Sequence, residues 1–212
     1  LGGGAHHGHY DFGHGFCVFN DIVTAIRKLQ ADGGVRSAWV IDVDAHKGDG
    51  TAALTADDPS IATLSIHMAN AWPLDLPRTL PDGRPAPWHV PGTIDVPVGA
   101  GEESSYLPRL RDALDRLARV ATGGTGDADI ASASGLPDIV YVVDGADPYE
   151  HDELPSTGDL RLTLDQLLAR DRMVYEFVAG LGVPQAWLMS GGYGTRAWEP
   201  FANFLAWAHR SR

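Results

Sequence analysis

The sequence contains a single cysteine, Cys17, so no internal disulfide can form. Chains without disulfides are typical of a reducing compartment, and we expect a cytoplasmic protein. No apolar run approaches the roughly 20 residues of a membrane helix, so no membrane span is expected. Basic residues are scarce as well: 16 lysines and arginines stand against 28 acidic residues, for a net charge of -12. Nonspecific nucleic-acid binding needs a basic face, and we expect no direct contact with nucleic acid.

What remains is the composition of a folded globular domain. Hydrophobic residues make up 44% of the chain and charged residues 21%, which excludes disorder, a collagen-like repeat and a coiled coil. The 212 residues suit one domain, 1–212, with a substantial core. The 25 glycines and 14 prolines exceed their usual combined share of about 12% and indicate many loops.

Apolar runs of strand length alternate with segments of helical spacing. Strands are predicted at 38–43, 61–66, 93–98, 139–143 and 186–189. Helices are predicted after a cap at Asp21, after Ser104 or Ser105, after a capping box at 163–166, and around Pro200. This alternation predicts an α/β fold of three layers, α/β/α, with a mostly parallel sheet. A long Pro-rich loop is expected at 72–91 and a flexible surface insertion at 123–135.

The run at 38–43 continues into residues of alternating chemistry. Asp42, Asp44 and His46 occupy every second position, and alternate residues of a strand share one face. Two carboxylates and an imidazole would then converge at the end of a buried strand, where unpaired charge is costly. A metal ion would offset that cost, with Asp44 and His46 as plausible ligands. Solvated acids at a strand end are the alternative.

The run at 139–143 also ends in acids, Asp144 and Asp147. Because α/β sheets place ligand sites at the carboxyl ends of their strands, Asp147 is a candidate third ligand. Taken alone, an aspartate before Pro148 is more typical of a turn.

Two glycine-rich stretches carry further polar groups. His6 and His7 follow three glycines, and histidine is the natural proton-transfer group near neutral pH, with Asp42 and Asp49 available to orient the rings. Glycines on both sides of Tyr193 allow a close backbone approach to a ligand, and its phenol could donate to a developing oxyanion. A merely polar loop and a glycine turn with a packed tyrosine are the alternatives.

Together and in this order, these stretches resemble the histone deacetylase superfamily, which has the arginase/deacetylase fold. The matching stretches are Gly-Gly-Gly-Ala-His-His at 2–7, Gly-Phe-Cys-Val-Phe-Asn-Asp at 15–21, Ile-Asp-Val-Asp-Ala-His-Lys-Gly-Asp-Gly at 41–50, Gly-Ala-Asp-Pro at 145–148 and Ser-Gly-Gly-Tyr at 190–193. They span nearly the whole chain and look most like the class IV and related bacterial branch.

The resemblance implies a zinc-dependent amidohydrolase that removes acetyl or other acyl groups from lysine side chains. The implied zinc ligands are Asp44, His46 and Asp147, with Fe²⁺ as the other possible ion. The resemblance also implies a structural site for K⁺ or Na⁺, formed largely by the backbone carbonyl groups of Asp42, Asp44, His46, Ser65 and Ile66.

Catalytic roles follow from the same resemblance. His7 matches the general base and acid, and His6 matches its electrostatic partner. Asp42 and Asp49 match the carboxylates that orient this pair, while Tyr193 matches the tyrosine that stabilises the oxyanion.

Three residues are predicted to contact the substrate: Phe16, Trp72 and Gly192. Phe16 matches a wall of the acyl-lysine tunnel. Trp72 lies in the long loop, where it could line the tunnel mouth or merely pack locally. The remaining histidines, among them His9 and His14, have no obvious partner in the sequence and are expected to be surface or satisfied side chains.

Family members normally carry a further segment before the paired histidines. We therefore expect the N-terminal strands of the fold to be missing here and the strand at 186–189 to form an uncovered sheet edge. The expected substrate is an acyl-lysine protein. The same catalytic set would also serve an acetylated polyamine or another small amine, and the acidic balance suits cationic substrates of either kind. An inactive fragment or binding module is the alternative of another class.

Overall fold

The computed structural model describes residues 2–121 and 135–210, and within them five strands form one parallel sheet. The strands are β1 (Ala38–Asp42), β2 (Ile61–Met68), β3 (Ile94–Val98), β4 (Ile139–Asp144) and β5 (Gln185–Met189), in the spatial order β3-β2-β1-β4-β5. All five predicted strands are confirmed to within two residues at either end. As expected, β5 lies at one edge of this sheet. The predicted insertion at 123–135 lies outside the described residues except for Gly135.

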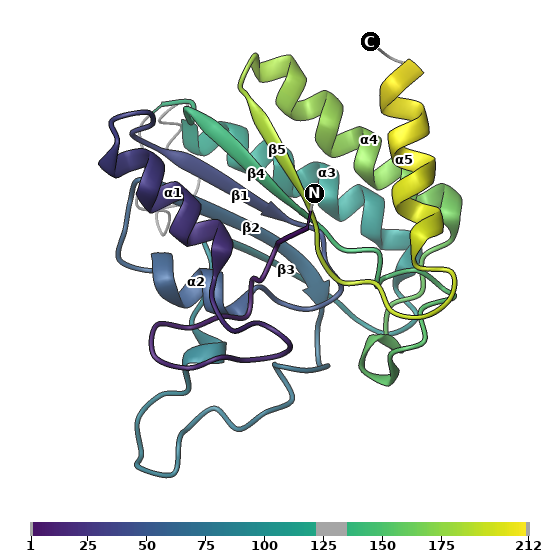
Figure 1. Ribbon diagram of the computed structural model, residues 1–212. Coiled ribbons are helices and arrows are strands. Elements are labelled where there is room, and N and C mark those ends of the chain that lie inside the picture. The colour runs from purple at the N-terminus through teal and green to yellow at the C-terminus, as the bar shows by residue number, and fades with distance from the viewer. Residues whose placement is uncertain (1, 122–134, 211–212) are drawn as a thin grey trace.

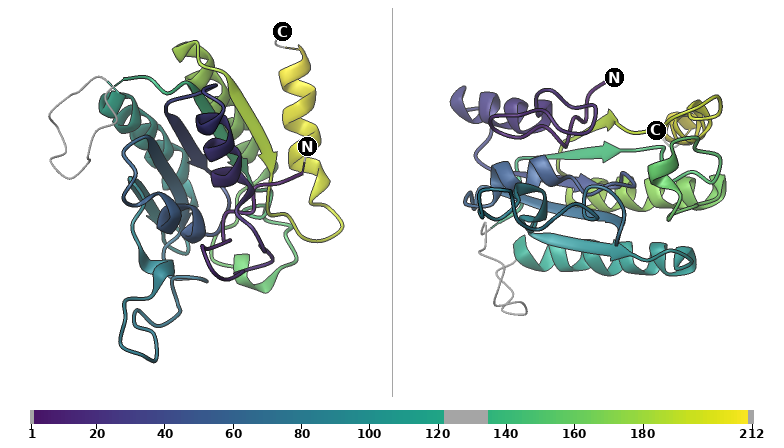
Figure 2. Two further views of the ribbon diagram at one scale, coloured as in Figure 1. Left: turned by 60° about the vertical axis from the view of Figure 1, so that its left-hand side comes forward. Right: turned by 90° about the horizontal axis from the view of Figure 1, so that it is seen from below.

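Helices cover both faces of the sheet (Figures 1 and 2). One face carries α1 (Asp21–Ala31) and α2 (Asp49–Thr55), and the other carries α3 (Glu103–Ala121), α4 (Leu164–Leu181) and α5 (Trp198–Arg210). The buried apolar side chains accordingly form two clusters, one on each side of the strands. The predicted three-layer α/β/α fold is confirmed. Within the described residues, no helix combines the length and the apolar character needed to pass through a lipid bilayer.

Local signals place most helix ends correctly. The capping box at the start of α4 is present, with Thr163 and Gln166 bonded reciprocally, and Gly182 ends the helix in a left-handed conformation. Pro200 lies in the first turn of α5, as predicted.

Three details differ from the predictions. The cap of α1 is Asn20, whose side chain accepts a hydrogen bond from the Val23 amide, while Asp21 is already helical. The third helix begins at Glu103, so Ser104 and Ser105 lie inside it. The seven-residue α2 was not predicted, because it is too short to show a helical repeat. The long loop at 72–91 includes a short 3₁₀ turn, Pro87–His89.

The strand order reverses direction at the centre of the sheet. From β1 the chain proceeds outward through β2 and β3, then returns to the opposite side of β1 with β4 and β5. Loops leaving adjacent strands in opposite directions open a crevice at the carboxyl ends, here between β1 and β4. The acidic residues that follow both strands therefore meet at this point.

A fully buried arginine lies beneath the crevice. The Arg170 guanidinium of α4 donates to the carbonyl oxygens of Val43 and Gly145 at 3.0 and 2.8 Å. It also donates to the carboxylates of Asp144 and Asp171, both at 2.6 Å. Arg170 thus bonds to both buried acids and ties the loops after β1 and β4 to the helix behind them.

We expect Arg170→Met to destabilise the fold by about 3–5 kcal/mol, because it leaves two buried carboxylates without their cation. The midpoint of urea unfolding measures this loss. Arg84→Met is the matched control, since Arg84 pairs with Asp82 on the surface and its loss should change stability by less than about 0.5 kcal/mol. Equal midpoints for the two variants would contradict the role assigned to Arg170.

Candidate metal and proton-transfer site

Three ligand-type side chains meet in the crevice between β1 and β4. Asp44, His46 and Asp147 are all buried, and one ligand atom from each lies within 4.8 Å of the other two. His46 Nδ1 lies 2.9 Å from Asp147 Oδ2 and 3.2 Å from Asp44 Oδ1. The structure thus brings together the three residues that the sequence proposed as metal ligands.

The unused bonding capacity of this cluster fits a cation. The second oxygens are held by backbone amides: Asp147 Oδ1 accepts from the Ala45 amide at 3.0 Å, and Asp44 Oδ2 accepts from the Gly191 amide at 2.9 Å. Asp147 Oδ2, however, is a buried oxygen that accepts no hydrogen bond of good geometry; the contact with His46 Nδ1 is an ion pair. His46 Nε2 lies 3.2 Å from Ser156 Oγ, which fixes the ring with Nδ1 facing the carboxylates.

The negative charges gathered in this cluster raise the pKa values of His46 and Asp147. Burial disfavours the charged ring of His46, but the close contacts with the Asp147 and Asp44 carboxylates outweigh burial and raise the pKa of His46 to about 10. Burial and the neighbouring Asp44 raise the pKa of Asp147 to about 7. The His46 ring nitrogen that faces the carboxylates must be unprotonated to bind a metal ion, so metal binding at this cluster releases a proton.

The paired histidines reach the same crevice from the loop before α1. The amides of Gly4 and Ala5 donate to the Asp21 carboxylate at 3.0 and 2.7 Å. The Ser190 hydroxyl, from the loop after β5, donates to the Gly4 carbonyl at 3.0 Å, and the Thr51 amide donates to the His6 carbonyl at 3.0 Å. Contacts to α1, α2 and the end of β5 thus anchor a glycine-rich segment that has no regular structure of its own.

Each ring of the pair has its own carboxylate. His6 Nδ1 donates to Asp42 Oδ2 at 2.7 Å, and His7 Nδ1 donates to Asp49 Oδ1 at 2.5 Å. The ring centroids of the two histidines are 3.9 Å apart. Burial opposes a charge on His6, but Asp42 and Asp44 raise its pKa to about 9, while burial and the charge of His6 lower the pKa of His7 to about 3. One ring is therefore charged at neutral pH and the other is neutral.

These groups line a cavity of about 300 Å³. Two residues of the candidate metal-ligand cluster, Asp44 and His46, line it. The paired histidines, the glycine-rich segments and several aromatic side chains, among them Phe16, Trp72 and Tyr193, form the other walls. Phe16 is 83% exposed and its ring centroid lies 5.6 Å from that of Tyr193, so the two rings stand at the mouth of the cavity. Trp72 lies deeper, with its ring centroid 4.6 Å from that of His7.

The remaining predicted residues occupy different positions. Gly192 does not line this cavity, although its neighbours Gly191 and Tyr193 do. Of the five residues expected to form a monovalent-cation site, Asp42 of β1 is paired in register with Ser65 of β2, and all five are buried. Burial and the charges of Asp44 and Asp147 raise the pKa of Tyr193, so its phenol keeps its proton.

Sequence reasoning missed the partners of two histidines. His9 Nε2 and His14 Nδ1 both lie 2.9 Å from Asp49 Oδ2, the oxygen that His7 does not use. Both rings have a hydrogen-bond partner, as expected, but they share a single oxygen atom of Asp49. The recurrence of histidine at 6, 7, 9 and 14 within one loop was the available signal for this cluster.

The chain is similar to known proteins over most of its length. The sequence profile described as the histone deacetylase domain matches residues 1–206. An uncharacterized protein of Picosynechococcus is 31% identical over 90% of this chain and 54% of its own length. Histone deacetylase 2 of Arabidopsis thaliana is 28% identical over 91% of this chain and 43% of its own.

Solved structures show the same fold. The acetylpolyamine aminohydrolase of Burkholderia pseudomallei superposes with a TM-score of 0.70 at 24% identity, covering 95% of this chain and 52% of that protein. The chain thus spans about half the length of the curated relatives and solved structures that it matches.

Gly191 offers a test of the metal-ligand cluster. A Cβ at this position would lie 2.6 Å from an oxygen of Asp44 and of Asp147, so Gly191→Ala should displace the carboxylates. We expect the variant to lose one equivalent of bound divalent metal per chain after dialysis, as determined by atomic emission. Gly180→Ala is the control, because a Cβ there meets nothing within 4 Å. Equal metal content in wild type and Gly191→Ala would show that these carboxylates do not hold the ion.

Proposed function

Because this chain belongs to the histone deacetylase family, we propose that it hydrolyses the amide bond of an acylated amine in the crevice between β1 and β4. The observation that carries the proposal is that one cavity is lined by two of the three clustered ligand-type residues, Asp44 and His46, by a carboxylate-bound histidine pair and by Tyr193. These are the groups that metal-assisted amide hydrolysis requires.

The cluster of Asp44, His46 and Asp147 is proposed to hold Zn²⁺, with Fe²⁺ as the other candidate. Two carboxylates and one imidazole make a three-residue set that leaves coordination positions open. Such an ion supplies Lewis-acid activation of the substrate carbonyl and of water.

The histidine pair is proposed to move the protons. Since His7 Nδ1 donates to Asp49, Nε2 is left as the acceptor for the proton of the attacking water. His6, held by Asp42, lies against the His7 ring and provides positive charge beside it. As the amide bond breaks, a histidine of the pair returns a proton to the departing amine.

Tyr193 is proposed to stabilise the charge that develops on the carbonyl oxygen. Its phenol keeps its proton, and its backbone is fixed from both sides: the Tyr193 amide donates to Asp152 at 2.7 Å, and its carbonyl accepts from the Glu153 amide at 3.0 Å. A donor held in place before the reaction stabilises an oxyanion more than one that must reorient.

The shape and charge of the site support an amine with an extended chain as the substrate. The aromatic rings of Phe16 and Trp72 stand along a cavity of about 300 Å³, which suits a methylene chain. The net charge of -12 favours a cationic molecule. Acyl-lysine in a protein is the leading candidate, and an acetylated polyamine is the second, favoured by the structural likeness to an acetylpolyamine aminohydrolase.

We also propose that K⁺ or Na⁺ binds behind the crevice, through carbonyl groups of Asp42, Asp44, His46, Ser65 and Ile66. The register of β1 on β2 supports this proposal, since it brings Asp42 opposite Ser65. An ion there would stiffen the backbone from which two of the proposed metal ligands project.

The catalytic roles predict two losses of activity. His7→Ala should reduce kcat on an acetyl-lysine peptide by about 10²–10⁴-fold, because proton transfer is lost. Tyr193→Phe should reduce it by about 10²–10³-fold, because one oxyanion donor is lost. Metal content should remain that of wild type in both. The control is Tyr10→Phe, since Tyr10 is 92% exposed and lies outside the cavity. Wild-type turnover by Tyr193→Phe would remove Tyr193 from the mechanism.

The substrate class is tested by comparing kcat/KM on an acetyl-lysine peptide with kcat/KM on an acetylated polyamine. We expect the peptide to be the better substrate, and the rate on either to fall with added salt, because the attraction of a cation to an acidic protein is screened. A reversed ratio would assign the site to small amines. A metal-loaded protein that turns over neither substrate would favour a binding module.

A further inference from the structure

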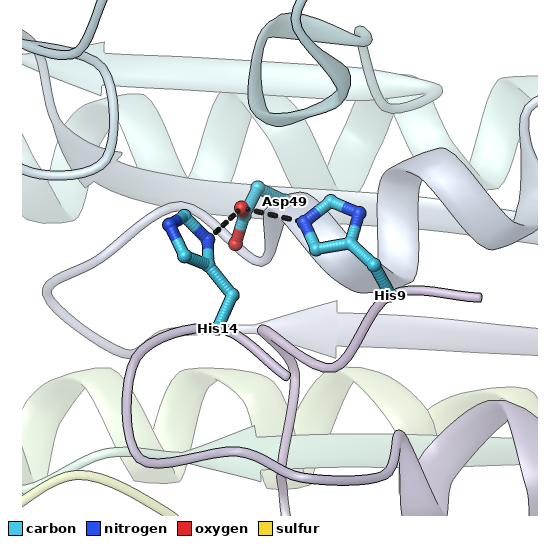
Figure 3. Close-up of side chains that lie close together, drawn as sticks. All are labelled: His9, His14 and Asp49. Atoms are coloured by element: carbon cyan, nitrogen blue, oxygen red, sulfur yellow. Dashed lines mark hydrogen bonds and ion pairs between the residues drawn. The ribbon is translucent and has the colours of Figure 1, made fainter. Parts of the chain in front are cut away.

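A second cluster of ligand-type side chains lies beside the proposed catalytic centre. His9 and His14 approach the carboxylate of Asp49 from opposite sides, and their rings point at it (Figure 3). His9 Nε2 and His14 Nδ1 are each 2.9 Å from Asp49 Oδ2. One ligand atom from each of the three residues lies within 4.8 Å of the other two. This cluster shares no residue with the one formed by Asp44, His46 and Asp147.

The three side chains are held by their surroundings. Asp49 is the first residue of α2 and is fully buried. The loop that carries the histidines is closed by backbone hydrogen bonds, from the His9 amide to the Phe12 carbonyl at 3.1 Å and between His14 and Cys17 in both directions. A site assembled on such fixed positions needs little rearrangement to accept a ligand.

Aromatic rings shield the cluster from solvent. The Phe12 ring stacks on His9 with a centroid separation of 4.4 Å. The rings of Trp72 and Trp88 lie 4.7 and 5.6 Å from the His14 ring. In such a setting an anion bound to a cation is stabilised more strongly than in water.

We propose that His9, His14 and Asp49 form a second site for a divalent transition-metal ion such as Zn²⁺. Two imidazole nitrogens and one carboxylate oxygen are a ligand set typical of that ion. Ligand atoms of a tetrahedral zinc site are about 3.3 Å apart, so the observed separations of 2.9 Å need to open only slightly. Without an ion, the same atoms form hydrogen bonds from the two rings to the carboxylate; with an ion, each ring turns its lone pair inward and carries its proton on the other nitrogen.

Binding at this site would act on the proposed reaction through a shared carboxylate. Asp49 Oδ1 accepts the bond from His7 Nδ1 at 2.5 Å, while Oδ2 is the atom offered to the ion. A cation on Oδ2 withdraws negative charge from Asp49 and so weakens the hydrogen bond between Asp49 Oδ1 and His7 Nδ1. That bond orients the His7 ring and keeps the proton on Nδ1. Occupation of the second site therefore diminishes activity; this consequence rests on the proposed function, whereas the binding does not.

The binding is tested on a protein whose first cluster has been removed. Asp44→Asn/Asp147→Asn should still bind one equivalent of Co²⁺, detected by its visible absorption, and the added change His14→Gln should abolish that equivalent. In an otherwise wild-type chain, two equivalents should fall to one in His9→Gln/His14→Gln. His209→Gln, an exposed histidine on α5, is the matched control and should retain two. Circular dichroism establishes that each variant is folded. If His9→Gln/His14→Gln does not fold, the single variant His14→Gln replaces it in the stoichiometry measurement.

The proposal is overturned if the folded Asp44→Asn/Asp147→Asn protein binds no Co²⁺, or if loss of His14 leaves the stoichiometry unchanged. The effect on activity is measured separately, as turnover against Zn²⁺ added beyond one equivalent. Wild type should be inhibited, and His14→Gln should need at least tenfold more Zn²⁺ for half-inhibition. Equal sensitivity would overturn the link to His7. If the chain has no deacylase activity, the proposed function is wrong. The second metal site is then still tested by the Co²⁺ stoichiometries, which do not depend on activity.

Discussion

Four buried carboxylates meet where β1, β4 and α2 present their ends, and the cost of holding them away from water governs the surrounding structure. Asp42 and Asp49 each accept a histidine N–H, while Asp44 and Asp147 share the imidazole of His46. Because like charges in a buried site are stable only with partners, the glycine-rich loop, the first turn of α2 and the loop after β5 must all reach this point.

The sequence was sufficient for the parts of this arrangement that depend on local pattern. Apolar runs of strand length located the strands, and helical spacing located the longer helices. This α/β alternation was enough to expect ligands at the carboxyl ends of the strands, where the observed strand order reverses. Alternation after the run at 38–43 selected Asp44 and His46, although β1 ends at Asp42 and both residues lie in the loop that follows it. Asp147 was ambiguous, since an aspartate before proline is also a turn signal, and only the pairing of β4 beside β1 resolves it.

Contacts distant in sequence were predicted only in part. The family resemblance paired Asp49 with the histidines at 6 and 7, but nothing in the sequence indicates that His9 and His14 would bond to Asp49 as well. Asp21 was assigned to a helix cap, because acidic residues favour helix starts, but Asn20 has that role and Asp21 binds the glycine-rich loop. In both cases an aspartate in the first turn of a helix accepts hydrogen bonds from a distant loop. The local sequence pattern indicates the start of the helix but not these bonds.

The bond from Asp21 to the loop also gives the histidine pair a reporter. The amides of Gly4 and Ala5 lie in a segment without regular structure, yet both donate to a carboxylate fixed in the first turn of α1. Their hydrogens should therefore exchange with deuterium as slowly as those of a helix rather than those of a loop. The exchange rate of these two amides thus reports whether the segment that carries His6 and His7 is held in place. An event that loosens α1 would speed the exchange, and it could be detected without a substrate.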